Sequence, residues 1–476
     1  MIVLPFFVEG LAHSSYLVGG DSCCAIVDPS RDVAHYIGAA DGLGLRITHV
    51  LETHLHADFV SGHLELAEKT GAEILAPASA NCAFEHRPVS EGDKIALDHI
   101  ELRVFETPGH TPEHISYVAI DRRRGADPVG VFCGDTLFVG DVGRPDLFPG
   151  RAEELAEKLF VSVHEKLATL PDFCEVYPAH GAGSLCGRAM SAKRSSTIGF
   201  EKRANPALKI EKKQDFVASL TRNMPPAPDH FSICTHINRQ GPAKVAELPR
   251  WKRLKAPAFF AQSQRPDTFV LDVRSYSAFG GQHVPGAINI DFRGNFPTFA
   301  GWVVPYDKAL LLVVGDKARG DNNGGLEKVV TWLRRVGLDR VEAVLDGGMF
   351  GWGVNGLPSD HILQLSAVEL YERITAAQPL QLLDVRAPQE FDQAHIDGAL
   401  NIPAPDVRHR HDELRKDVAT AITCSTGYRS SLAASILAGM GFKKLFNVAG
   451  GMNGYHAAGH LGRCRMCVAP HGPQVL

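Results

Sequence analysis

A repeat in the C-terminal half is the feature that most limits what this chain can fold into. Residues 271–274 read Leu-Asp-Val-Arg, and so do residues 383–386, an offset of 112 residues (384 minus 272). The same offset relates His283 to His395 and Asn289 to Asn401, and a Gly-Gly-Met run follows in each copy, at 347–349 and 450–452. Two copies of a unit this long indicate two homologous domains in tandem.

In each copy, short Val/Ile/Leu-rich strands alternate with helical patterns, which is typical of an α/β domain with a parallel sheet. The front half lacks the repeat, and a proline-rich stretch at 224–228 follows it. A length of 476 residues agrees with about three domains. We expect a multidomain α/β protein with domains at residues 1–250, 255–360 and 363–476.

Composition excludes several functional classes. The chain has 49 Lys and Arg against 54 Asp and Glu, so no basic excess favours nucleic acid as a partner. Ten cysteines are too few for a disulfide scaffold of this size and indicate a reducing compartment, so we expect the cytoplasm. The apolar runs are too short to predict a membrane span, and the N-terminus predicts a strand pair rather than a signal peptide.

Four apolar segments of the first domain end at side chains that bind metals. These segments are 47–51, 102–105, 131–133 and 176–177, and His or Asp follows each of them. Side chains at strand ends, alternating along extended loops, can converge on one point, which predicts a metal pocket. Other histidines, including His13, His63 and His114, lack this support. The six candidate ligands are His54, His56, Asp58, His110, Asp135 and His180.

The His-x-His-x-Asp run with its later partners resembles the metallo-β-lactamase superfamily. The resemblance covers the first domain and implies an αββα sandwich with the metal at one edge of its two sheets. Many hydrolases of the superfamily carry a second His after the Asp, where this chain has Phe59. A dinuclear site would use Asp58, that missing His, His180 and a bridging Asp135, so a mononuclear centre is favoured.

Two histidines and one carboxylate, as His54, His110 and Asp135 would provide, are typical of non-haem Fe(II) oxygenases. Spacing alone leaves His56 open as a further ligand. The runs Thr-His-Leu-His-Ala-Asp, Thr-Pro-Gly-His-Thr-Pro-Glu-His, Cys-Gly-Asp-Thr-Leu-Phe and Gly-Arg-Pro-Asp-Leu resemble the persulfide dioxygenase branch of the superfamily. That resemblance implies one Fe(II) on these three residues, with zinc as the alternative metal. The supporting residues would then be His56, Asp58 and His180.

Two residues near this pocket are candidates for substrate contacts. Arg144 would hold either the substrate or the pocket loop, the latter through an ion pair with Asp141 or Asp146. Cys186 follows His180 by six residues and could carry sulfur at the pocket mouth, although a small buried apolar role is favoured.

The last copy contains the strongest nucleophile candidate. A short strand ends at Cys424, a loop continues to Arg429, and a helix is predicted to about Gly441. Backbone N–H groups of the loop, the helix N-terminus and Arg429 would stabilise a thiolate or a persulfide anion. The expected cradle consists of Ser425, Thr426, Gly427 and Tyr428.

This loop and its flanking motifs resemble the rhodanese family over residues 363–460. The resemblance implies sulfur transfer through a persulfide on Cys424. We expect Arg386 to pair with Glu390 in a structural role. The middle copy has no Cys at the matching strand end, and Asp316 there would repel a persulfide anion, so we expect an inactive domain.

The leading hypothesis is a fusion of a persulfide dioxygenase with a rhodanese-type sulfurtransferase. Its small-molecule partners would be a persulfide, O₂, sulfite and thiosulfate. The alternatives are a zinc thioester hydrolase with a rhodanese domain and a non-oxidative sulfur-relay protein. The sequence leaves open the carrier thiol, a homo-oligomer and any role of Cys464 and Cys467, for which a plain tail is favoured.

Overall fold

The computed structural model describes residues 1–188, 190–222, 224, 227–315 and 325–461. The chain divides into two compact units. The first comprises Met1–Leu248 with Thr331–Gly337, and the second comprises Pro249–Val330 with Leu338–Leu476. Within the described residues, no helix has both the length and the apolar character needed to cross a bilayer.

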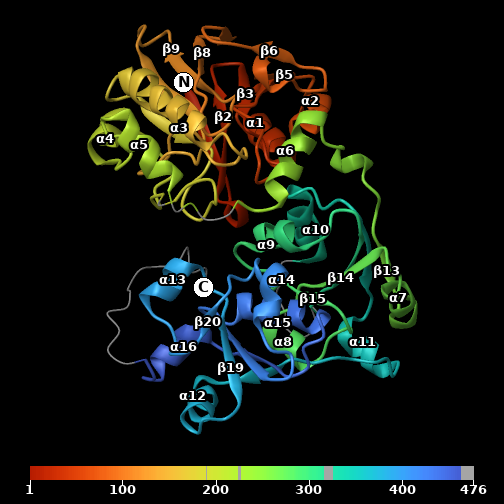
Figure 1. Ribbon diagram of the computed structural model, residues 1–476. Helices are drawn as coiled ribbons and strands as arrows, with labels where there is room; N and C mark the ends of the chain where they lie inside the picture. The colour runs from red at the N-terminus through yellow and green to blue at the C-terminus, as the bar shows by residue number, and fades with distance from the viewer. Residues whose placement is uncertain (189, 223, 225–226, 316–324, 462–476) are drawn as a thin grey trace. The chain divides into compact units, whose positions relative to one another are not determined.

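Two six-stranded sheets form the centre of the first unit (Figure 1). The first sheet runs in chain order through β1 (Ile2–Val8), β2 (His13–Gly19), β3 (Cys23–Val27), β4 (Arg46–Leu51), β5 (Glu73–Pro77) and β6 (Arg87–Val89). The second contains β7 (Lys94–Leu97), β8 (Ile100–Glu106), β9 (Ile115–Asp121), β10 (Pro128–Gly134), β11 (Glu175–Pro178) and β12 (Ser196–Thr197). The predicted N-terminal strand pair is confirmed, because β1 and β2 are antiparallel neighbours.

Three apolar layers show how the sheets and helices stack. One cluster, including Val27 and Tyr117, joins the inner faces of the two sheets. A second packs helices against the first sheet, and a third packs helices against the second sheet. The resulting order of helix, sheet, sheet and helix confirms the αββα sandwich. The helices of this unit are α1 (Ala34–Gly42), α2 (His63–Thr70), α3 (Ala152–Phe160), α4 (Ile198–Ala204), α5 (Lys213–Thr221) and α6 (His230–Gln240).

The second unit contains two five-stranded parallel sheets with the same strand order. The first has the order β13 (Lys252–Leu254), β17 (Val341–Leu345), β16 (Ala309–Val313), β14 (Thr268–Asp272) and β15 (Ile288–Asn289). The second has the order β18 (Leu363–Leu365), β22 (Leu445–Val448), β21 (Ala419–Thr423), β19 (Leu380–Asp384) and β20 (Leu400–Asn401). The prediction of two homologous parallel α/β domains is confirmed.

The helices of the second unit follow the same repeat. In the middle copy they are α7 (Ala256–Ser263), α8 (Tyr276–Gly281), α9 (Phe296–Val303), α10 (Gly325–Arg335) and α11 (Gly348–Val354), of which α10 belongs to the first unit from Thr331 onward. In the last copy they are α12 (Ala367–Thr375), α13 (Pro388–Gln393), α14 (Val407–Arg410), α15 (Tyr428–Gly439) and α16 (Gly451–Ala457). Three residues singled out in the sequence, Asp316, Cys464 and Cys467, lie outside the described residues.

Candidate functional site

The first unit brings His54, His110 and Asp135 together in a buried cluster. Nε2 of His110 lies 3.4 Å from Oδ2 of Asp135, and Nε2 of His54 lies 3.9 Å from the same oxygen. One ligand atom from each residue lies within 4.8 Å of the others. Three strand ends that are far apart in the sequence therefore converge on one point.

Each histidine of this cluster is oriented through its other ring nitrogen. Nδ1 of His54 is 2.9 Å from Oγ1 of Thr53, and Nδ1 of His110 is 2.9 Å from the carbonyl oxygen of Arg144. Nε2 of His110 is buried and has no hydrogen-bond partner among the described residues. A buried nitrogen without a partner, in a ring held by its second nitrogen, is what a metal ligand requires, so the cluster fits one metal ion.

Asp135 is held on both its side chain and its backbone. Nδ1 of His180 lies 2.7 Å from its Oδ1, and the backbone N–H of Asp135 donates to Nε2 of His114 at 2.9 Å. A Cβ on Gly134 would lie 2.5 Å from both His114 and Thr53, so only glycine permits this packing. His114 is thus a positioning residue that sequence reasoning missed, although it ends the Thr-Pro-Gly-His-Thr-Pro-Glu-His run.

The protonation states of the cluster suit metal binding. Burial lowers the pKa of His54 well below its ordinary value, and the neighbouring histidines His56 and His114 lower it further. Burial likewise lowers the pKa of His110. Burial alone would raise the pKa of Asp135, but the charges of His180 and of its other histidine neighbours hold it well below its ordinary value. Two neutral imidazoles and one carboxylate result.

His56 belongs to a different cluster. Its Nε2 lies 3.2 Å from Oδ1 of Asp28 and 3.6 Å from Oε2 of Glu52, and these three residues form a separate buried group. Burial alone would lower the pKa of His56, but the Asp28 carboxylate raises it above its ordinary value. In the structure, Nε2 of His56 thus faces carboxylates that lie outside the cluster of His54, His110 and Asp135.

Asp58 and His180 form a third group with Cys186. Nε2 of His180 lies 2.8 Å from Oδ2 of Asp58. The sulfur of Cys186 is buried, and burial, followed by the nearby carboxylates, raises the pKa of this thiol well above its ordinary value. Phe59, where a second histidine would stand, is fully buried with its ring 4.0 Å from the ring of His13.

The two substrate-contact candidates are both buried. Arg144 makes two hydrogen bonds of 2.7 Å to the carboxylate of Asp146, so it ties down the loop. Asp141, the other candidate partner, accepts from the backbone N–H of Arg188 at 2.6 Å. Cys186 packs among apolar side chains, including Ala57 and Phe231, rather than at an open pocket mouth.

In the second unit, Cys424 directly follows β21 and is buried. Its Sγ accepts from the backbone N–H of Gly427 at 3.1 Å and from the Ser430 hydroxyl at 3.4 Å. Gly427 has a φ of 108° and caps α15, so the loop is shorter than expected and the helix begins at Tyr428. The loop thus directs donors at the sulfur, as a thiolate or persulfide needs.

The expected pairing of Arg386 with Glu390 is wrong. Arg386 donates to the carboxylate of Asp384, two residues away, at 2.7 to 3.0 Å. Glu390 instead accepts two hydrogen bonds from Arg429, at 2.6 and 2.8 Å, and one from Ser425. The positive charge predicted at the end of the loop is therefore paired, and Glu390 fixes the loop from outside.

The second glycine of the Gly-Gly-Met run, Gly451, packs closely against the backbone of the Cys424 loop. A Cβ on Gly451 would overlap the carbonyl oxygen of Cys424. That carbonyl accepts from the backbone N–H of Met452 at 2.7 Å, and Asn453 donates to Ser425 at 3.0 Å. Sequence reasoning used this run only to align the repeats, and it missed this role.

The middle copy contacts the same loop. A Cβ on Gly427 would lie 3.1 Å from the ring of Tyr276, which meets the Tyr428 ring edge to face at 5.3 Å. The Arg293 guanidinium lies 5.1 Å from the centre of the Tyr428 ring. The middle copy therefore contacts Gly427 and Tyr428 of the Cys424 loop.

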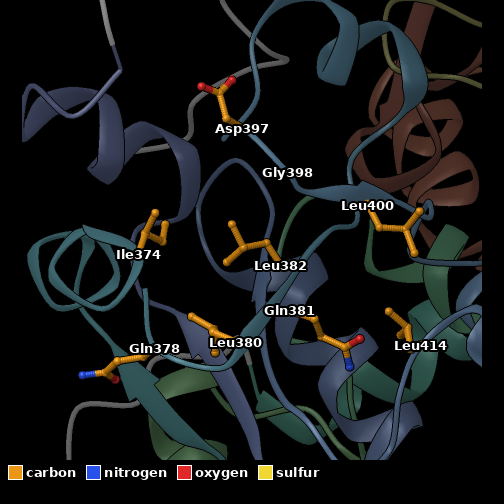
Figure 2. A pocket seen from close by; sticks show the side chains of 9 residues that line it. All are labelled: Ile374, Gln378, Leu380, Gln381, Leu382, Asp397, Gly398, Leu400 and Leu414. Carbon is orange, nitrogen blue, oxygen red and sulfur yellow. The ribbon is translucent and has the colours of Figure 1, made fainter. Parts of the chain in front are cut away.

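The last copy also has a surface pocket of about 410 Å³, lined by residues of β19, α12 and nearby loops, including Ile374 and Leu382 (Figure 2). None of its nine lining residues belongs to the Cys424 loop. We assign no function to it.

Family comparisons agree with this division of the chain. The metallo-beta-lactamase superfamily matches residues 8–180, and the rhodanese-like domain matches residues 257–355 and 366–458. The mitochondrial persulfide dioxygenase of Bos taurus is 30% identical over 229 residues, which cover 47% of this chain and 82% of that protein. The chain belongs to the metallo-beta-lactamase superfamily. C-terminal to the metallo-beta-lactamase domain, it contains two rhodanese-like domains.

Two further proteins are similar to this chain, and their names describe other activities than persulfide oxidation. A hydroxyacylglutathione hydrolase of Rhodospirillum rubrum is 40% identical over 159 residues, which cover 33% of this chain and only 57% of that protein. A crystal structure of a metallo-beta-lactamase from Staphylococcus aureus is 34% identical with a TM-score of 0.63, and the match covers 72% of this chain and 98% of that one. The similarities support an enzyme and leave two activities as candidates.

Proposed function

We propose that the first unit is an iron-dependent persulfide dioxygenase and that the last copy is a sulfurtransferase acting through Cys424. The observation that carries the first part is the ligand set. Two neutral imidazoles and one carboxylate converge at His54, His110 and Asp135, while His56 faces other carboxylates. This is the set that non-haem Fe(II) oxygenases use.

The reaction proposed for the first unit balances as R-S-SH + O₂ + H₂O giving R-SH and sulfurous acid, which ionises to sulfite. A bound Fe(II) would supply the redox chemistry with O₂. The protein's own groups would position the metal: Thr53 and the Arg144 carbonyl orient the two imidazoles, and Nδ1 of His180 contacts both oxygens of Asp135, at 2.7 and 3.0 Å. Oδ2 of Asp135 also faces both Nε2 atoms.

In the last copy, the Cys424 thiolate would attack the outer sulfur of thiosulfate. A Cys424 persulfide forms as the S–S bond of thiosulfate breaks, and sulfite leaves. The N–H of Gly427 and the Ser430 hydroxyl, which already contact the sulfur, would hold the anion. Since sulfite is also the product proposed for the first unit, the two reactions can share an intermediate.

The competing function is a zinc hydrolase of thioesters. It is favoured by the hydrolase relatives and by the second group, Asp58, His180 and Cys186, which could hold a second metal. It is opposed by Phe59, which leaves a ring without ligand nitrogens where the second metal needs one.

Metal analysis combined with activity separates these functions. We expect about one iron per chain and O₂ uptake with a persulfide substrate. Two zinc ions with thioester cleavage would establish the hydrolase instead. Neither activity, with Cys424 still labelled by sulfur from thiosulfate, would indicate a sulfur-relay protein.

A further inference from the structure

The middle copy has no Cys at the strand end that matches Cys424, yet it packs against the loop and helix that follow Cys424. Apart from residues 331–337, both copies belong to one compact unit. Its contacts fall on a glycine that caps α15 and on three residues within that helix. These four residues are Gly427, Tyr428, Ser431 and Ser435.

Tyr276, the first residue of α8, packs against Gly427. Among the described residues, the three atoms nearest to a Cβ placed on Gly427 all belong to the Tyr276 ring, at 3.1 to 3.4 Å. Gly427 supplies the backbone N–H that donates to Sγ of Cys424 at 3.1 Å. A glycine has the widest choice of backbone conformations and no side chain to anchor it, so its neighbours decide where its N–H points. The Tyr276 ring is therefore placed to hold this donor.

Asn289 holds the first turns of α15. Its Oδ1 accepts from the Ser431 hydroxyl at 2.7 Å, and its backbone N–H donates to Oγ of Ser435 at 3.1 Å. Ser430, the residue before Ser431, donates its hydroxyl to Sγ of Cys424 at 3.4 Å. Neighbouring residues of an α-helix point about 100° apart around its axis, so fixing Ser431 also fixes the direction of Ser430.

Both middle-copy residues are fixed within their own domain. Nδ2 of Asn289 donates to the carbonyl oxygens of Asp272 and Arg274, both at 3.0 Å. The backbone N–H of Tyr276 donates to a carboxylate of the same copy at 3.3 Å. The last copy has no equivalent of the ring, because the position 112 residues after Tyr276 is Pro388. The middle copy thus presents to the Cys424 loop two fixed groups from outside the last copy.

We propose that the middle copy positions the nucleophile of the last copy, because Tyr276 and Asn289 hold the two groups that donate hydrogen bonds to Sγ of Cys424. The inference goes beyond sulfur transfer, since it concerns how readily Cys424 reacts with any small electrophile. The two donors would stabilise the thiolate, which is the reactive form of the thiol, so a loop that loses them reacts more slowly. Tyr276 and Asn289 are positioning residues, since they act on the sulfur through Gly427 and Ser430.

The test is the rate at which iodoacetamide alkylates Cys424 in the full chain, followed by mass spectrometry of the peptide that contains it. At pH 6 an ordinary thiol carries little of its anion, so the rate follows the thiolate population. Tyr276→Ala should slow the alkylation by roughly threefold to tenfold, as expected for a weakened hydrogen bond to a charged group. Tyr276→Phe keeps the ring and should react like the wild type. Ser431→Ala removes only the bond to Asn289 and should slow the alkylation by about twofold.

Phe260→Ala is the matched control. Phe260 is a half-buried aromatic residue of the same copy, and its ring meets Trp352 edge to face at 5.6 Å, much as Tyr276 meets Tyr428 at 5.3 Å. We expect a loss of stability in urea similar to that of Tyr276→Ala and an unchanged alkylation rate.

Equal alkylation of the wild type and Tyr276→Ala would overturn the proposal. So would an equal slowing in Phe260→Ala, or a Tyr276→Phe chain as slow as Tyr276→Ala. If Tyr276→Ala does not fold, Ser431→Ala decides, and a rate equal to that of the wild type would then overturn the proposal. Because alkylation is read without turnover, a chain that shows the expected rates but takes no sulfur from thiosulfate would refute only the sulfurtransferase function.

Discussion

The two rhodanese-like copies share a frame and differ in one loop. Arg274 donates to Asp272 from Nε and from a terminal nitrogen at 2.9 and 2.6 Å, and the Arg386 to Asp384 bonds measure 3.0 and 2.7 Å. His283 stacks on Phe279 at 3.8 Å, and His395 stacks on Phe391 at 3.9 Å.

Near the Cys424 loop the copies diverge. In the last copy a Cβ on Gly451 would overlap the carbonyl oxygen of Cys424, whereas in the middle copy the nearest atom of the described residues to a Cβ on Gly348 is the Val314 carbonyl oxygen at 3.9 Å. Glu390 braces Arg429 in one copy, and the position 112 residues earlier is Ala278. The two copies therefore share the contacts of the frame and differ in the contacts around the Cys424 loop.

The largest effect should come from Cys424→Ser, which makes the last copy resemble the middle one. We expect sulfur transfer from thiosulfate to fall by roughly a thousandfold or more, since the nucleophile is removed. O₂ uptake with persulfide should stay within about twofold of wild type. Measuring the release of sulfite from thiosulfate and the consumption of O₂ with a persulfide checks these two expectations. Sulfur transfer that persists in the variant would mean that another thiol carries the sulfur.

Gly451→Ala and Gly348→Ala form a matched pair, because the two residues have φ values of 55° and 54° and so equal backbone strain. The added methyl group meets the Cys424 carbonyl only in the last copy. We expect Gly451→Ala to slow sulfur transfer by roughly tenfold to a hundredfold through displacement of the loop, and Gly348→Ala to have little effect. Similar rates for the two variants would show that the close contact does not position Cys424.

At acidic pH, the last copy should lose the stabilisation that its ion pair between Glu390 and Arg429 contributes, and the middle copy has Ala278 at the position that matches Glu390. Burial alone would raise its pKa, but the hydrogen bonds and charge of Arg429 lower it to about 2. Because the folded pKa is depressed, the stabilisation is complete above about pH 4.5 and is lost as the pH falls toward 2. Glu390→Gln should reduce stability near neutral pH by about 2 kcal/mol and flatten the acid dependence over that range. Urea unfolding between pH 2.5 and 6 measures this; parallel curves would contradict it.

The smallest effect concerns one of the hydrogen bonds that join the two copies. Asn289 and Asn401 each donate to two backbone carbonyls of their own copy, but only Asn289 also accepts from the Ser431 hydroxyl, at 2.7 Å. Asn289→Ala should therefore cost about 1 kcal/mol more than Asn401→Ala. Chemical denaturation of the two variants compares them, and equal losses would mean that the Ser431 bond contributes nothing.

Much of the fold could be read from the sequence, because periodicity and repetition are local signals. The offset of 112 residues predicted two homologous sheets, and strand-end ligands predicted a convergent cluster. The predicted partner of Arg386, Glu390, was wrong. Asp384, two residues away, competes with Glu390, four residues away, and only the path of the backbone decides between the two carboxylates. The ring direction of His56 was equally unreadable.

By itself, the sequence predicted the tandem α/β repeat and the residue types of the candidate metal cluster, and it singled out Cys424 as the candidate nucleophile. The αββα sandwich followed from the resemblance to the metallo-β-lactamase superfamily. The tertiary structure alone decided which carboxylates each histidine faces, why Gly451 must be glycine, and that Asn238 of α6 donates to the backbone of the ligand loop. The physical reason is range. Strand and helix patterns follow from neighbours along the chain, whereas a hydrogen bond or a steric contact depends on residues that only folding brings within a few ångströms.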